Sequence, residues 1–197
     1  MSNNGEAIVQ LFAKVRQICE QVSLLLQTAD EQMSKAGFKS EGNTAIDGIS
    51  YAIYNGRQWI PTTAFRFYRH ANYPRKLAFI SVLFDSHTDR TYLLKEPYVT
   101  AGILDFGEND ASLQGNYWYS RYFGFLLKDP QLNPDGNPIS FDNAKLEKDL
   151  QGDFKNGAVF AVPLVSITNS DEIKLQIVNK LINLFKNTEN KTQVQKR

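Results

Sequence analysis

The sequence predicts an α+β domain in which an antiparallel sheet of five to six strands packs against a long N-terminal helix and a C-terminal helix. Apolar residues recur every three or four positions near both ends of the chain, and short aromatic and β-branched runs fill the middle. No helical pattern of ten or more residues separates the first five of these runs, so we expect antiparallel neighbours. A length of 197 residues with 42% apolar content fits a single domain, residues 1–197.

The first helix is expected over residues 6–36, before Gly37, a residue typical of a left-handed helix stop. At about 1.5 Å per residue it would be roughly 45 Å long, more than a domain of this size spans. We therefore expect part of its apolar seam to meet a second copy or another protein; the alternative is that the whole seam covers the chain's own sheet. The seam consists of Ile8, Leu11, Val15, Ile18, Val22 and Leu25, with a second row at Phe12, Cys19, Leu26 and Met33.

A polar link, residues 39–48, should lead into a β-rich body over residues 49–166. Within this body, residues 129–157 are rich in Pro, Asn, Asp and Gly and are predicted to form a long loop. The candidate strands are "ISYAIYN", "WIPTTAFRFYRH", "KLAFISVLFDS", "PYVTAGILDF", "YWYSRYFGFLL" and "AVFAVPLVSI".

The C-terminal helix is predicted over residues 170–186, with Thr168 and Asp171 as a capping box. Residues 187–197 have no apolar anchor and are expected to form a flexible tail.

Composition excludes several classes of protein. The net charge of +1 does not fit a generally basic nucleic-acid coat. One cysteine, Cys19, excludes an internal disulfide, and neither a signal peptide nor a long apolar run occurs, so we expect a cytoplasmic protein that is not in a membrane. No cofactor is predicted.

The tripeptide Asp105-Phe106-Gly107 matches the magnesium-binding motif of protein kinases, but the other kinase motifs are missing. We expect Leu104 and Phe106 to point inward, Asp105 to face out and Gly107 to begin a turn.

A metal site is one hypothesis for "FDSHTDR", because Asp85, His87 and Asp89 would point to the same side of an extended chain. This would make the chain a metal-dependent hydrolase or nuclease. The same residues are also typical of a polar hairpin loop.

A second hypothesis concerns residues 57–76, where aromatic side chains alternate with basic ones. Single-stranded nucleic acid binds such mixtures through stacking and phosphate neutralisation. A half-buried strand would show the same alternation. The candidate residues are Arg66, Tyr68, Arg69, Arg75 and Lys76.

The sequence contains no recognisable catalytic set. The leading interpretation is therefore a non-catalytic regulatory or interaction protein that self-associates or binds a protein partner through its N-terminal helix. The alternatives are a nucleic-acid-binding module using residues 57–76 and a metal-dependent enzyme at Asp85, His87 and Asp89.

Overall fold

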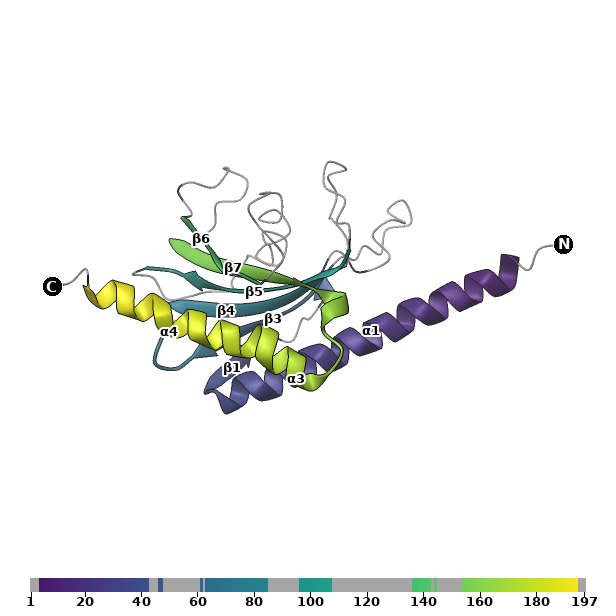
Figure 1. The fold of residues 1–197 in the computed structure, drawn as a ribbon, viewed down its shortest axis with the longest axis horizontal. Coiled ribbons are helices and arrows are strands. Elements are labelled where there is room, and N and C mark those ends of the chain that lie inside the picture. Colours follow the sequence, from purple (N-terminus) through teal and green to yellow (C-terminus); the bar gives the residue numbers. More distant parts are fainter. Residues whose placement is uncertain are drawn as a thin grey trace.

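The computed structural model describes residues 4–42, 46–47, 61, 63–84, 96–107, 136–142, 144 and 154–194. It shows an antiparallel sheet with two helices lying side by side on one face, which confirms the predicted α+β class (Figure 1). The predicted strands "ISYAIYN" and "YWYSRYFGFLL", and most of the loop at residues 129–157, lie outside the described residues. The loop prediction was wrong where the structure has strand β6 (Ile139–Asp142), a short edge strand that is ordered by pairing with β7.

Six strands follow one another across the sheet in the order β1-β3-β4-β5-β7-β6, and each neighbouring pair is antiparallel. The two-residue strand β2 (Ile46–Asp47) also pairs with β3. The six are β1 (Phe38–Glu41), β3 (Thr63–His70), β4 (Lys76–Leu83), β5 (Tyr98–Asp105), β7 (Asn156–Pro163) and β6 (Ile139–Asp142).

The prediction of a polar link at residues 39–48 was wrong in part. Lys39, Ser40 and Glu41 continue from buried Phe38 as strand β1, which pairs with β3 at one edge of the sheet. An edge strand needs few apolar residues, because it is buried on fewer sides than a central strand. The polar composition of β1 therefore did not predict a strand.

Helix α1 (Asn4–Lys35) ends at the predicted position. The Gly37 N–H donates to the Ser34 carbonyl at 2.9 Å, and Gly37 has a φ of 87°. This left-handed conformation costs glycine little, so the chain can reverse directly into β1.

The C-terminal helix runs continuously through α3 (Ser170–Glu172), the π-helical stretch η5 (Ile173–Val178) and α4 (Asn179–Val194). It follows β7 through a 3-10 turn, η4 (Leu164–Ser166). Its backbone is helical to Val194, beyond the expected end at residue 186, because no glycine or proline interrupts the later turns.

The helix start is displaced by one residue from the predicted capping box. Asn169, not Thr168, is the N-cap, and its side chain accepts hydrogen bonds from the N–H groups of Asp171 and Glu172 at 3.0 Å each. The Glu172 carboxylate reaches back to Thr168, accepting from its N–H and hydroxyl groups. These bonds lower the pKa of Glu172.

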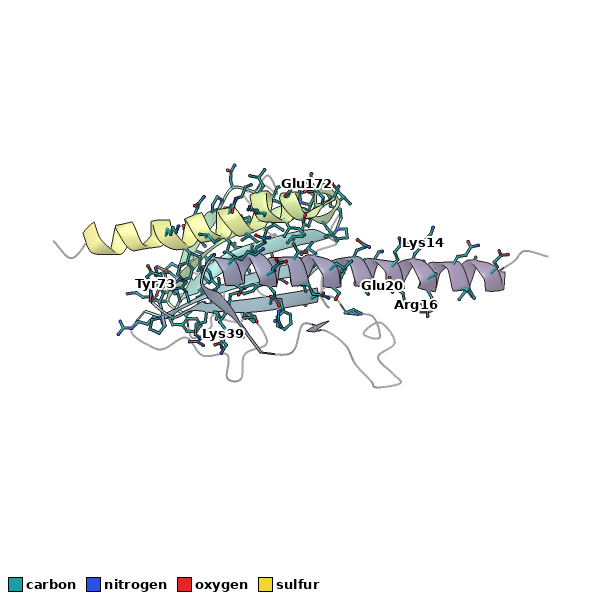
Figure 2. All side chains as sticks on the ribbon, turned by 90° about the horizontal axis from the view of Figure 1, so that it is seen from below. Lys14, Arg16, Glu20, Lys39, Tyr73 and Glu172 are labelled. Carbon is teal, nitrogen blue, oxygen red and sulfur yellow. The ribbon has the colours of Figure 1, made fainter. Side chains whose placement is uncertain are left out.

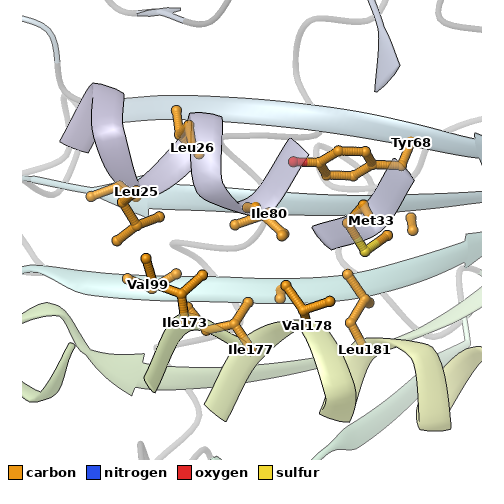
Figure 3. Packing of buried hydrophobic residues seen from close by; sticks show 14 of the residues in the cluster. Leu25, Leu26, Met33, Tyr68, Ile80, Val99, Ile173, Ile177, Val178 and Leu181 are labelled. Carbon is orange, nitrogen blue, oxygen red and sulfur yellow. The ribbon is translucent and has the colours of Figure 1, made fainter. Parts of the chain in front are cut away.

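Alternation along the strands divides the core between the two sheet faces. The helix-covered face carries Tyr68, Ile80, Val99 and Phe160, which pack against α1 and the C-terminal helix (Figure 3). The opposite face carries a second cluster that contains Phe65, Phe79 and Leu104. Between the strands, the buried hydroxyls of Thr63 and Ser81 lie 2.9 Å apart and share a hydrogen bond.

Glycine at position 102 in the central strand β5 is required by close packing. A Cβ there would lie 2.3 Å from the Ala158 carbonyl oxygen and 2.6 Å from Cζ of Phe79. We expect Gly102→Ala to lower the free energy of unfolding by about 3 kcal/mol or more, measured by urea denaturation. Gly5→Ala is the control, because a Cβ at Gly5 meets no atom within 4 Å. An unchanged midpoint for Gly102→Ala would contradict this packing.

Candidate functional site

Helix α1 divides into two parts at Val22. Residues 22–35, the packed half, contribute Val22, Leu25, Leu26, Ala29 and Met33 to the core on the sheet. Residues 5–21, the exposed half, contain no buried side chain, and only Val15 among them is half-buried. The large exposed apolar side chains there are Ile8, Val9, Leu11, Phe12 and Ile18.

The two halves differ because the helix is longer than the sheet that it covers. At about 1.5 Å per residue the 32 residues of α1 extend about 48 Å. A strand of eight residues at about 3.3 Å each extends only about 26 Å. Figures 1 and 2 show the N-terminal part of α1 continuing well past the end of the sheet.

The exposed apolar stripe is the continuation of the buried one. Ile8 and Val15 precede Val22 at intervals of seven, as Leu11 and Ile18 precede Leu25, and as Phe12 and Cys19 precede Leu26. Residues seven apart lie close to the same face of a helix. Leu25 is only 6% exposed, whereas Leu11 is 61% exposed on nearly the same face. The side of α1 that packs on the sheet therefore remains uncovered beyond it.

Two hollows flank α1 where it leaves the sheet. One, of about 210 Å³, lies between α1 residues such as Cys19 and Leu26 and the β3 residues Ala64 and Arg66. The other, of about 530 Å³, lies between α1 and residues 164–173, and Ile18 and Leu25 line it. Both hollows are continuous with the stripe, so the exposed surface does not end at Ile18.

The predicted partner-binding residues fall into two groups. Ile8, Leu11 and Ile18 are exposed and Val15 is half-buried, so these four belong to the exposed half. Val22 and Leu25 are buried against the chain's own sheet and cannot face a partner in this arrangement. Val9 and Leu24 are also exposed apolar residues of α1, but they fall outside the heptad pattern that the prediction used.

Two of the three arginines of the nucleic-acid hypothesis, Arg66 and Arg69, point to opposite faces of β3, and each meets a carboxylate. Arg66 donates from Nη2 to Oδ2 of Asp30 on α1 at 2.8 Å, and from Nη1 to the Gly42 carbonyl. The hydrogen bond to Asp30 raises the pKa of Arg66. Arg69 donates from Nε to Oε1 of Glu41 on β1 at 2.8 Å. These pairs tie α1 and β1 to β3.

The remaining candidates of that hypothesis are spread over different surroundings. Tyr68 is fully buried, and this burial raises its pKa, so its ring offers no stacking surface. Lys76 lies over the rings of Tyr73 and Phe185, whereas Arg75 is exposed in the turn before β4. Nucleic-acid binding stays a prediction, to which this arrangement adds no support.

The proposed metal ligands Asp85, His87 and Asp89 lie outside the described residues, so the metal-site hypothesis also stays a prediction. Within the part of the chain that the structure describes, no three His, Cys, Asp or Glu side chains gather as a metal site would require. Asp105 accepts a hydrogen bond from the Gly107 N–H at 2.9 Å, while Leu104 and Phe106 are buried, as expected for a turn after a strand.

Comparison with known proteins gives no match to a family model, to a curated protein or to a solved structure. The described helices include none with the length and apolar character needed to cross a membrane.

The division of α1 can be tested with one substitution at two sites. Leu25→Ala should lower the free energy of unfolding by about 2–5 kcal/mol, because it leaves a cavity in the core. Leu11→Ala should change it by no more than about 0.5 kcal/mol. Both are measured by urea denaturation of dilute protein, so that association does not contribute. Equal losses at the two positions would show that the whole stripe belongs to the chain's own core.

Proposed function

We propose that this chain is a non-catalytic interaction protein that binds another protein chain through the exposed half of α1. The observation that carries the proposal is the apolar stripe that passes from the sheet into solvent without a change of pattern. Four large side chains on it, Ile8, Leu11, Phe12 and Ile18, are each about half exposed or more. Contiguous apolar surface of this kind is typical of interaction sites.

The composition of the exposed half supports the same conclusion. A single helix of this length is only marginally stable in water, and the β-branched residues Ile8, Val9, Val15 and Ile18 lower its helix propensity further. Packing of the stripe against another chain would stabilise the helix where its intrinsic helix propensity is too low to do so.

We call the sheet, the packed half of α1 and the C-terminal helix the body of the protein. Ion pairs within this body favour a role for it as a scaffold that holds the exposed half. The contacts from Arg66 to Asp30 and from Arg69 to Glu41 hold α1, β1 and β3 together. Asp30 lies on the packed half, two turns beyond Val22, and so fixes the direction in which the exposed half leaves the sheet. A fixed direction reduces the entropy lost when a partner binds.

Site-specific photo-crosslinking tests the proposal. A photoreactive phenylalanine analogue replaces Leu11 in the full chain, within cells that naturally express it, and the control places the analogue at Gln10 on the neighbouring polar side. We expect a discrete protein adduct from position 11 and not from position 10. If position 11 yields no adduct, the proposed function is wrong.

A further inference from the structure

The exposed half of α1 is self-complementary, and we propose that its partner is a second copy of this chain, bound antiparallel about a two-fold axis at the level of Ala13. This inference rests on the proposed function and names the partner for the same surface. Its first support is an arithmetic property of the stripe. The positions 8 and 18 add to 26, and so do 11 and 15.

In an antiparallel pair of identical helices, each residue of one copy lies level with one residue of the other copy, and the two residue numbers always add to the same total. With a sum of 26, Ile8 of each copy packs against Ile18 of the other, and Leu11 packs against Val15. Each contact occurs twice, as a two-fold interface requires. The four layers use the exposed residues Ile8, Leu11 and Ile18 with half-buried Val15, and none that the core has already buried.

The position of the body decides the direction of pairing. From Val22 onward the stripe side of α1 is covered by the chain's own sheet. In a parallel pair the second helix would continue along that side into the space that the sheet occupies. Figure 2 shows the N-terminal part of α1 projecting past the sheet. In the antiparallel pair the second helix would begin near the height of Val22 and run along this projecting part, away from the sheet, so the two sheets would lie at opposite ends of the helix pair.

The hollows beside α1 lie where the start of the second helix would arrive. Cys19 and Val22 line one hollow, and Ile18 and Val22 line the other. At a constant sum of 26, these positions face residues 4–8 of the second copy. The interface therefore continues from the helix pair onto the end of each sheet.

The area fits a weak dimer. Ile8, Leu11, Phe12 and Ile18 each offer roughly 100 Å² and half-buried Val15 offers less, so two copies would bury about 900 Å², which is typical of weak interfaces. The charges of the exposed half, Glu6, Lys14, Arg16 and Glu20, cancel. Lys14 of each copy would flank the axis facing the other, which limits the affinity. We expect a dissociation constant of about 1–100 μM.

Sedimentation of the purified full chain over a range of concentrations tests for the dimer. Leu11→Asp/Val15→Asp places four carboxylates at the axis and should weaken association by at least about 100-fold. Gln10→Asp/Ala13→Asp adds the same charge to the polar side of the helix and should leave association unchanged. Unfolding of dilute protein shows whether both variants keep the fold.

Crosslinking of the native Cys19, which is exposed, tests the direction. A Gly5→Cys variant treated with a short bis-maleimide should yield intermolecular links between positions 5 and 19, which lie at nearly the same height. Links between two Cys19 side chains are not expected, because these would be separated by about 18 Å along the helix pair. Products linked from 19 to 19 and from 5 to 5, without links between 5 and 19, would show parallel pairing and overturn the proposal.

The outcomes separate this inference from the proposed function. A chain that stays monomeric at 200 μM, or a dimer that is unaffected by Leu11→Asp/Val15→Asp, overturns the antiparallel dimer. If position 11 nevertheless gives a photo-adduct with a different protein, the proposed function stands and only the identity of the partner changes. If neither a dimer nor an adduct is found, both proposals fail.

Discussion

The mismatch in length between one helix and the sheet beneath it is the constraint on which the rest of this structure depends. Strands of eight residues can cover only about half of a helix of 32 residues, because a strand advances about 3.3 Å per residue and a helix about 1.5 Å. The packed half of α1 completes the core. The exposed half has the same apolar stripe and no sheet to cover it. Its apolar side chains therefore remain accessible to another protein chain.

The packed half is held at a defined angle by contacts of two kinds. Leu25, Leu26 and Met33 interlock with the sheet residues and with Ile173 and Ile177 of the C-terminal helix, as Figure 3 shows. The ion pair between Asp30 and Arg66 then fixes α1 relative to β3. Apolar burial supplies most of the free energy, while the partly exposed ion pair contributes chiefly to orientation. The body thus presents the exposed half in one direction.

The sequence predicted those features that local patterns encode. The spacing of apolar residues located both helices, and the aromatic and β-branched runs located β3, β4, β5 and β7. It failed at β1, where Lys39, Ser40 and Glu41 have little strand propensity and are ordered by pairing with β3. It also failed at β6, which lies within the predicted loop and is ordered by pairing with β7. It also extended the partner surface to Val22 and Leu25, because a heptad pattern does not change where a helix moves from solvent onto a sheet.

Thus the sequence by itself determined the α+β class, the length of α1 and the continuity of its stripe, since these depend on residue spacing and turn chemistry. Tertiary structure alone decided where the stripe leaves the core, because that boundary depends on where the sheet ends. It also decided that Arg66 and Arg69 meet Asp30 and Glu41, 36 and 28 residues away in the chain. Contacts at such separations follow from strand order and register, which no local pattern specifies.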